Sequence, residues 1–195
     1  MYTAPDEILA EIDRSSLLAL LSDDERERHA RFHFDHDRDG YLVAHALTRR
    51  LLAEVAGDDA RALTCIANEH GRPALCSPRA ALPFRFNLSH TRGLVACGVT
   101  RAREIGIDVE RIDREVELLA VARHVFSPRE IGELERMLGE AQRRRFFELW
   151  TLKEAYVKAI GKGLAAPLRS ISFAPGPHDP VPVHFDPEAN DDAST

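Results

Sequence analysis

The chain has 195 residues, of which 44% are apolar and 30% are charged, so it has an ordinary globular composition and is long enough to bury a real core. A formal net charge of −6 argues against a general nucleic-acid surface, which needs a basic excess. The longest apolar runs fall far short of the roughly 18 residues of a membrane helix, so no membrane association is expected.

The N-terminus and the cysteines favour the cytoplasm. The first six residues lack the basic start and apolar core of a secretory signal. The cysteines are odd in number and show no metal-binding spacing, so reduced thiols are expected at Cys65, Cys76 and Cys97.

The first third of the chain is predicted to be helical. Residues 5–30 form a helical stretch in which Ser22 resembles an N-cap before a charged run. From residue 37 to 56, apolar side chains recur at helical spacing, and Gly57 is a plausible C-cap.

Strands are predicted next. A short strand covers 63–66 and a turn covers 68–73. Residues 84–90 alternate strictly between apolar and polar side chains, and a tight turn leads to a buried partner strand over 94–99. A third strand is expected over 105–110.

Helices return in the last third. One is expected within 113–124, and a capping box with proline at the first helical position begins another at Ser127, which is expected to run to about Gly139. A long helix then extends to Gly161. Two strand candidates and a polar, disordered tail follow, at 169–173, 181–185 and 186–195.

The long helix before Gly161 holds all three lysines of the chain, whereas arginine is used everywhere else. Lys153 falls in the middle of an apolar arc, and Glu154 and Lys158 lie one turn apart along its edge. A lysine ammonium can have its pKa moved by burial and is suited to phosphate. The alternative is an ordinary amphipathic helix with a Glu-to-Lys pair four residues apart.

Two carboxylates in the third predicted strand indicate a cation site. Asp108 and Glu110 would leave one strand face about 7 Å apart, where Mg²⁺ would relieve their repulsion. Gly106 clears the same face, so a ligand or backbone could come close, and Glu154 could complete a carboxylate trio. The alternative is an exposed, solvated sheet face.

His90 ends a strand whose polar face also carries Asn87 and Ser89, although a histidine at a strand end is often structural. The sequence has no nucleophile elbow, phosphate loop, zinc spacing or dinucleotide fingerprint. The available groups therefore favour attack at a phosphorus atom of a polyphosphate, with a carboxylate–metal site near basic side chains.

A weak internal repeat aligns the helix ending at Gly57 with the helix ending at Gly161, pairing Arg49 with Lys153. We therefore predict an α+β fold of two pseudo-symmetric halves, 1–104 and 105–195, each a long helix on a small, mostly antiparallel sheet. The active site would lie between the halves.

Three segments in this order and spacing carry a family resemblance: Phe86-Asn-Leu-Ser-His90, Ile105-Gly-Ile-Asp-Val-Glu110 and Trp150-Thr-Leu-Lys-Glu-Ala-Tyr-Val-Lys158. The chain resembles the 4'-phosphopantetheinyl transferases, specifically the surfactin-type group with two fused halves. The similarity runs from about Glu25 to Phe173. It implies transfer of phosphopantetheine from coenzyme A to a serine of an apo acyl or peptidyl carrier protein, with release of 3',5'-ADP.

The resemblance also implies residue roles. Asp108, Glu110 and Glu154 would hold Mg²⁺. Glu154 would accept the serine proton, directly or through water, with Glu110 as the rival base. Lys158 would neutralise charge on the bridging oxygen and contact the substrate.

Coenzyme A would be bound by residues from the first half. Arg28, Arg72 and His90 would contact its phosphates, and Asn87 and Ser89 would line the nucleotide pocket. The family commonly has lysine where Arg72 stands.

Family members also usually continue with further strands, so we expect an incomplete second sheet, whether the chain is naturally short or truncated. Two halves in one chain favour a monomer. The alternatives are a magnesium-dependent hydrolase of nucleotide pyrophosphates and a non-catalytic module that binds coenzyme A or a carrier protein.

Overall fold

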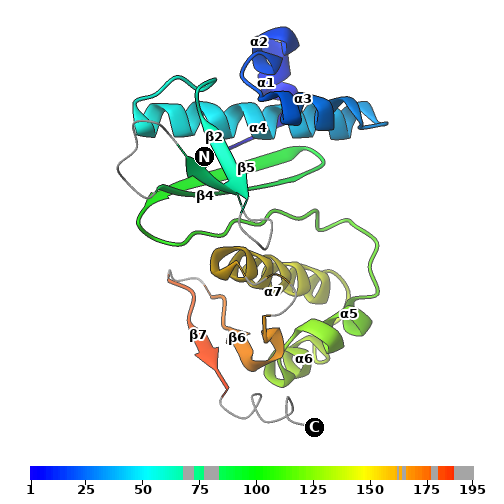
Figure 1. Ribbon diagram of the computed structural model, residues 1–195. Helices are drawn as coiled ribbons and strands as arrows, with labels where there is room; N and C mark the ends of the chain where they lie inside the picture. The colour runs from blue at the N-terminus through cyan, green and yellow to red at the C-terminus, as the bar shows by residue number, and fades with distance from the viewer. Residues whose placement is uncertain (68–72, 77–83, 162, 164–165, 177–179, 187–195) are drawn as a thin grey trace. The chain divides into compact units, whose positions relative to one another are not determined.

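The computed structural model describes residues 1–67, 73–76, 84–161, 163, 166–176 and 180–186. The chain forms two compact units, one of residues 1–109 with 155–163 and the other of residues 110–154 with 164–195 (Figure 1). Their elements are mixed helices and small antiparallel sheets, as the predicted α+β class requires.

The first unit begins with three short helices where one helical stretch was predicted. They are α1 (Pro5–Glu11), α2 (Arg14–Leu18) and α3 (Asp23–Ala30). The chain is extended at Ile12 and Asp13, which ends α1 and begins α2. Ser22 caps α3 as predicted, because its hydroxyl accepts the Glu25 N–H while the Glu25 carboxylate accepts the Ser22 N–H.

Helix α4 (Asp35–Ala56) is the central element of the first unit, and Gly57 ends it in the left-handed conformation, as predicted. One part of α4 packs with α1, α2 and strand β5 in a cluster that includes Leu17, Leu42 and Val95. Figure 1 shows α4 lying across the sheet, with the three short helices on its other side.

The sheet of this unit has the order β1-β5-β4. Strands β4 (Phe84–Thr91) and β5 (Leu94–Arg101) form the predicted hairpin, in which Thr91 is opposite Leu94 and Gly93 turns the chain with a φ of 88°. Strand β1 (Tyr2–Thr3), which the sequence did not predict, pairs with β5. Strands β2 (Thr64–Ala67) and β3 (Pro73–Cys76) form a separate antiparallel pair.

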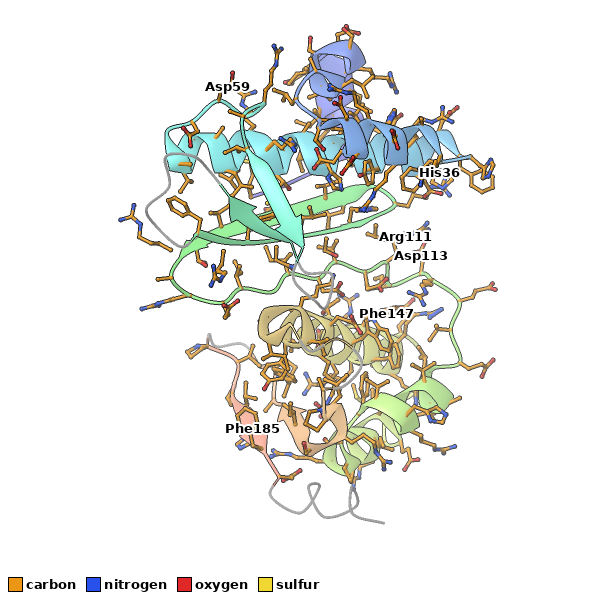
Figure 2. All side chains as sticks on the ribbon, viewed as in Figure 1. His36, Asp59, Arg111, Asp113, Phe147 and Phe185 are labelled. Atoms are coloured by element: carbon orange, nitrogen blue, oxygen red, sulfur yellow. The ribbon has the colours of Figure 1, made fainter. Side chains whose placement is uncertain are left out.

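The second unit packs α5 (Leu118–Val125), α6 (Pro128–Leu134) and the first part of α7 (Gly139–Ile160) with β6 (Ile171–Phe173) and its partner β7 (Val183–Phe185). A short 3₁₀ turn, η2 (Leu168–Ser170), precedes β6. Its core is aromatic: Phe126 and Phe146 are fully buried, with ring centroids 5.2 Å apart. Phe185 on β7 is exposed (Figure 2).

Two predicted elements are wrong. The helix capped at Ser127 ends at Leu134 rather than near Gly139, and Gly139, with a φ of 59°, starts α7 instead. Residues 105–110 are extended but form no strand. No helix in the described ranges is long and apolar enough to span a membrane.

Candidate active site

The acidic segment 105–110 is held against strand β4 by side-chain hydrogen bonds rather than by a backbone ladder. The Ile107 N–H donates to Asn87 Oδ1 at 2.7 Å, and the Val109 N–H donates to Ser89 Oγ at 3.3 Å. Because β4 offers these two side chains in place of its backbone, the segment is extended without being a strand. Asn87 and Ser89 are both buried.

Gly106 brings the same segment against the backbone of α7. A β-carbon built on Gly106 would lie 1.7 Å from the carbonyl oxygen of Ala155 and 2.6 Å from the nitrogen of Ala159. No side chain fits at this position, so the requirement for glycine is steric. The sequence indicated a close approach at Gly106 but could not identify the partner.

Asp108 and Lys158 meet at this contact. Lys158 Nζ donates to Asp108 Oδ1 at 2.7 Å and to Ser89 Oγ at 3.1 Å. The Ser89 hydroxyl in turn donates to Asp108 Oδ1 at 3.2 Å. An ammonium has three N–H donors, so these contacts leave one for another acceptor.

The second oxygen of Asp108 is the most informative atom of the site. The Asp108 side chain is only 7% exposed, yet Oδ2 is buried without a hydrogen-bond partner among the described residues. A buried carboxylate oxygen without a partner is costly, and it indicates that a cation or donor is accommodated there. A hard oxygen ligand of this kind suits Mg²⁺.

The other two predicted carboxylates belong to the second unit, whereas Asp108 belongs to the first. Glu110 forms an ion pair with Arg114 at 3.2 Å. Glu154 lies one helical turn before Lys158 on α7. Within the described ranges, no cluster of three or more histidine, cysteine or carboxylate side chains that could hold a metal is present.

Lys153 has a structural environment in the second unit. Its ammonium is fully buried, forms an ion pair with Glu130 at 2.8 Å and donates to the carbonyl oxygens of Leu168 and Ile171 at 2.7 and 2.6 Å. Burial lowers the pKa of Lys153, while the neighbouring Glu130 carboxylate opposes that change. Lys153, which the sequence placed in the apolar arc of the helix, therefore stabilises the packing of α7 against α6 and β6.

His90 lies near the end of β4 on the face of Phe86 and Leu88, opposite to the face of Asn87 and Ser89, and it is exposed. Burial is the main cause that lowers the pKa of His90; electrostatic interaction with His45 and Lys158 acts in the same direction, and Asp37 opposes it. Its imidazole is therefore mainly neutral at pH 7 and can serve as a hydrogen-bond donor or acceptor.

Arg28 is exposed near the C-terminal end of α3 and makes no ion pair with any described residue. It acts electrostatically on Tyr41, a residue that the sequence did not indicate. The Tyr41 ring is buried against His45, with centroids 4.0 Å apart, and its hydroxyl has no partner among the described residues. Burial raises the pKa of Tyr41 to about 12, so the hydroxyl is a neutral donor.

Glu25 connects α3 to α4 through its carboxylate. Its carboxylate pairs with Arg49 Nε at 2.5 Å and contacts His45 Nδ1 at 3.0 Å. Burial alone would raise the pKa of Glu25, but hydrogen bonds from His45, the Ser22 N–H and Arg49 outweigh it and lower the pKa to about 2. The predicted coenzyme A contact Arg72 lies outside the described residues.

These features accompany clear similarity to known proteins. Two family models match the chain. The model described as "4'-phosphopantetheinyl transferase superfamily" matches residues 104–194, and the model described as "4'-phosphopantetheinyl transferase, N-terminal" matches residues 11–100. The chain belongs to the 4'-phosphopantetheinyl transferase superfamily, as the sequence motifs predicted.

Individual relatives are similar over most of the chain. The 4'-phosphopantetheinyl transferase HetI of Nostoc sp. is 34% identical over 171 residues, which cover 88% of this chain and 72% of HetI. The 4'-phosphopantetheinyl transferase Sfp of Bacillus subtilis is 30% identical over 168 residues, 86% of this chain and 72% of Sfp. The 4'-phosphopantetheinyl transferase gsp of Aneurinibacillus migulanus is 33% identical over 163 residues, 82% of this chain and 65% of its own length.

Proposed function

We propose that this chain transfers 4'-phosphopantetheine from coenzyme A to a serine of an apo acyl or peptidyl carrier protein. The observation that carries the proposal is the contact between Asp108 and Lys158 at 2.7 Å, which joins two of the three motif segments in a member of this superfamily. A carboxylate with a buried, unpartnered oxygen beside a lysine with a remaining donor suits a magnesium-bound pyrophosphate.

Three carboxylates would hold the magnesium ion: Asp108, Glu110 and Glu154. When bound, Mg²⁺ would supply charge neutralisation for the pyrophosphate oxygens. The donor chemistry supports this assignment, because Mg²⁺ prefers a few carboxylates together with phosphate oxygens and water. Glu110 would have to exchange its contact with Arg114 for the ion.

The protein side chains would then move the proton and neutralise the leaving group. The serine oxygen attacks the phosphorus that bears the pantetheine arm, and the bond from that phosphorus to the bridging oxygen breaks, releasing 3',5'-ADP. Glu154, directly or through water, accepts the serine proton, with Glu110 as the rival base. The remaining N–H donor of Lys158 neutralises the charge on the bridging oxygen and can return a proton to it.

Coenzyme A would be bound by basic groups of the first unit. Arg28 is exposed and makes no ion pair with the described residues, so it can pair with a phosphate. His90 and Arg72 would also contact the phosphates of coenzyme A. Asn87 and Ser89 would shape the nucleotide pocket through the segment they hold, because their side-chain oxygens are engaged there.

We further propose that the chain consists of two related halves, 1–104 and 105–195, acting as a monomer with the active site between them. The support is a repeated arrangement within each unit. The capping-box glutamate Glu25 pairs with Arg49 of α4, and the capping-box glutamate Glu130 pairs with Lys153 of α7. Helices α4 and α7 each contain 22 residues.

The test is incubation with coenzyme A, Mg²⁺ and an apo carrier protein, followed by intact mass measurement of the carrier. We expect the carrier to gain the mass of phosphopantetheine, and Asp108→Asn to remove this gain while the circular dichroism spectrum is retained. Cleavage of coenzyme A without carrier modification would indicate a hydrolase instead. Binding of coenzyme A with neither reaction would indicate a binding module.

A further inference from the structure

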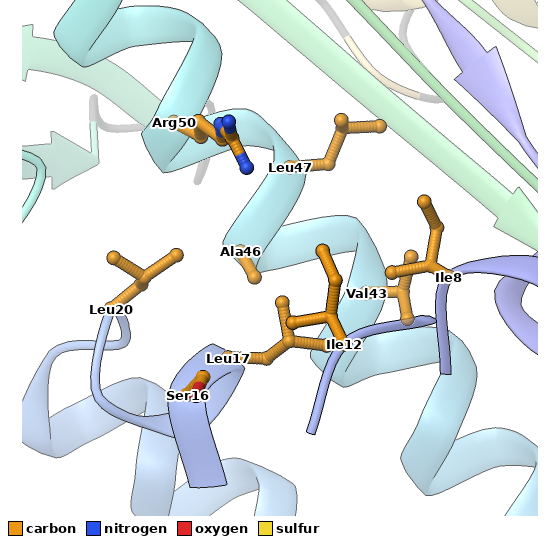
Figure 3. A pocket seen from close by; sticks show the side chains of 9 residues that line it. All are labelled: Ile8, Ile12, Ser16, Leu17, Leu20, Val43, Ala46, Leu47 and Arg50. Atoms are coloured by element: carbon orange, nitrogen blue, oxygen red, sulfur yellow. The ribbon is translucent and has the colours of Figure 1, made fainter. Parts of the chain in front are cut away.

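An apolar pocket lies in the first unit, between α4 and the short helices α1 and α2 (Figure 3). Its volume is about 180 Å³. Aliphatic side chains form its walls, among them Ile8, Ile12, Leu17, Leu20, Val43 and Leu47. A pocket of this kind is a gap at the edge of the core, where the lining atoms lack packing partners.

Water is a poor occupant for this space. A buried water needs two to four polar partners, and a dry aliphatic cavity of about 150 Å³ accepts benzene in preference to water. The pocket therefore has room for an apolar group of about six carbon atoms.

Two polar side chains stand among the aliphatic ones. They are Ser16 from α2 and Arg50 from α4, which Figure 3 shows on different elements of the pocket wall. Arg50 is exposed and makes no ion pair or side-chain hydrogen bond with any residue that the structure describes. An arginine guanidinium matches a planar carboxylate with two parallel hydrogen bonds.

From this combination we propose a second ligand site, separate from the transfer reaction, that takes a small carboxylate with an apolar tail of about six carbons. The tail fills the aliphatic space, and the carboxylate pairs with Arg50 at the rim. Charge complementarity distinguishes this occupant from a neutral hydrocarbon, because only a carboxylate can form an ion pair with the Arg50 guanidinium. The length of the tail distinguishes it from a free small anion.

The test uses hexanoate as the probe, measured by isothermal titration calorimetry on the full chain. We expect one site with a dissociation constant of about 1 mM or tighter. Hexan-1-ol, with the same tail and no charge, should bind about tenfold or more weakly, and acetate, with the charge and no tail, should not saturate.

Variants locate the site. Arg50→Gln should weaken hexanoate binding about tenfold or more, because a hydrogen bond to a charged group is lost. Ser16→Phe should abolish binding by filling the space next to α2, and Ser16 is exposed, so the bulky side chain can be tolerated. Arg61→Gln is the matched control: it removes the same charge from an exposed arginine of the same unit outside the pocket, and it should bind hexanoate as the parent does.

The proposal is wrong if no binding is detected at a hexanoate concentration 20-fold above the expected dissociation constant. It is also wrong if hexan-1-ol binds as tightly as hexanoate, or if Arg50→Gln binds hexanoate as tightly as the parent does. Should Ser16→Phe fail to fold, as judged by circular dichroism, the Arg50→Gln comparison decides the outcome. Because the readout is binding of hexanoate alone, failure here leaves the proposed transfer reaction untouched, and loss of transferase activity leaves this site untouched.

Discussion

Gly106→Ala tests the contact on which the proposed active site depends. The added methyl group would overlap backbone atoms of α7, at 1.7 Å from the Ala155 oxygen and 2.6 Å from the Ala159 nitrogen. Backbone atoms of a packed helix cannot rotate away, so the segment that contains Gly106 has to move. Its movement would break the hydrogen bonds that hold Ile107 and Val109 and separate Asp108 from Lys158.

The expected loss of stability follows from these contacts. Each of the two backbone-to-side-chain hydrogen bonds is worth about 1 kcal/mol, and the charge-assisted contact of Asp108 with Lys158 about 1.5–3 kcal/mol. The sum is about 3.5–5 kcal/mol. For a chain of this size, each kcal/mol lowers Tm by about 2–4 °C, so the expected decrease is about 7–20 °C.

Thermal unfolding followed by circular dichroism measures the effect, and two other glycines provide controls. Gly176→Ala should be nearly neutral, since among the described residues no atom beyond its chain neighbours lies within 4 Å of its added carbon. Gly98→Ala should have an intermediate effect, because the atoms nearest to its added carbon are the side-chain ends of Ile105 and Ile107, at 2.6 and 2.7 Å. A Tm of Gly106→Ala equal to that of Gly176→Ala would refute the close approach of the acidic segment to α7.

Three other variants test individual groups. Lys153→Met should destabilise the protein by about 3–5 kcal/mol in urea unfolding, because it leaves Glu130 buried without its counter-ion; a loss below 1 kcal/mol would contradict this. Glu25→Gln should cost about 3 kcal/mol at pH 7. The folded pKa of Glu25, about 2, lies below its ordinary value of 4.5, so the stabilisation is complete above pH 4.5 and should vanish as the pH falls towards 2; a difference that stayed constant over this range would oppose the ion-pair account. His90→Gln should remove a tightening of coenzyme A binding below pH 6.5, measured by calorimetry, because protonation of His90 adds a positive charge there; an unchanged pH dependence would exclude His90 from the phosphate site.

Local signals in the sequence predicted local structure well. Ser22 and Ser127 begin helices because each capping box satisfies its backbone donors with side chains only three residues away. Gly57 ends α4, and the alternation of residues 84–90 gives strand β4. These features depend on neighbours along the chain, so the sequence contains the necessary information.

The errors have a different origin. The strand predicted over 105–110 is wrong because alternation indicates an extended backbone but not which atoms accept its N–H groups; here Asn87 and Ser89 accept two of them. Strand β1 was missed because two residues carry no periodic signal. The sequence named Asp108 and Lys158 as candidate site residues, and the structure brings these two side chains into contact. The buried Tyr41 hydroxyl was missed because it depends on packing that no motif records.

The burial of Lys153 has a practical consequence for chemical labelling. The chain has only three lysines, and the Lys153 side chain is 1% exposed, whereas that of Lys158 is 30% exposed. An amine-reactive ester should therefore acylate Lys158 much faster than Lys153. Comparing the acylation of Lys158 with and without coenzyme A, by peptide mass spectrometry, would then report whether coenzyme A occupies the proposed site. Acetylation of Lys158 would, by the same reasoning, remove its positive charge from Asp108 without disturbing the buried ammonium of Lys153.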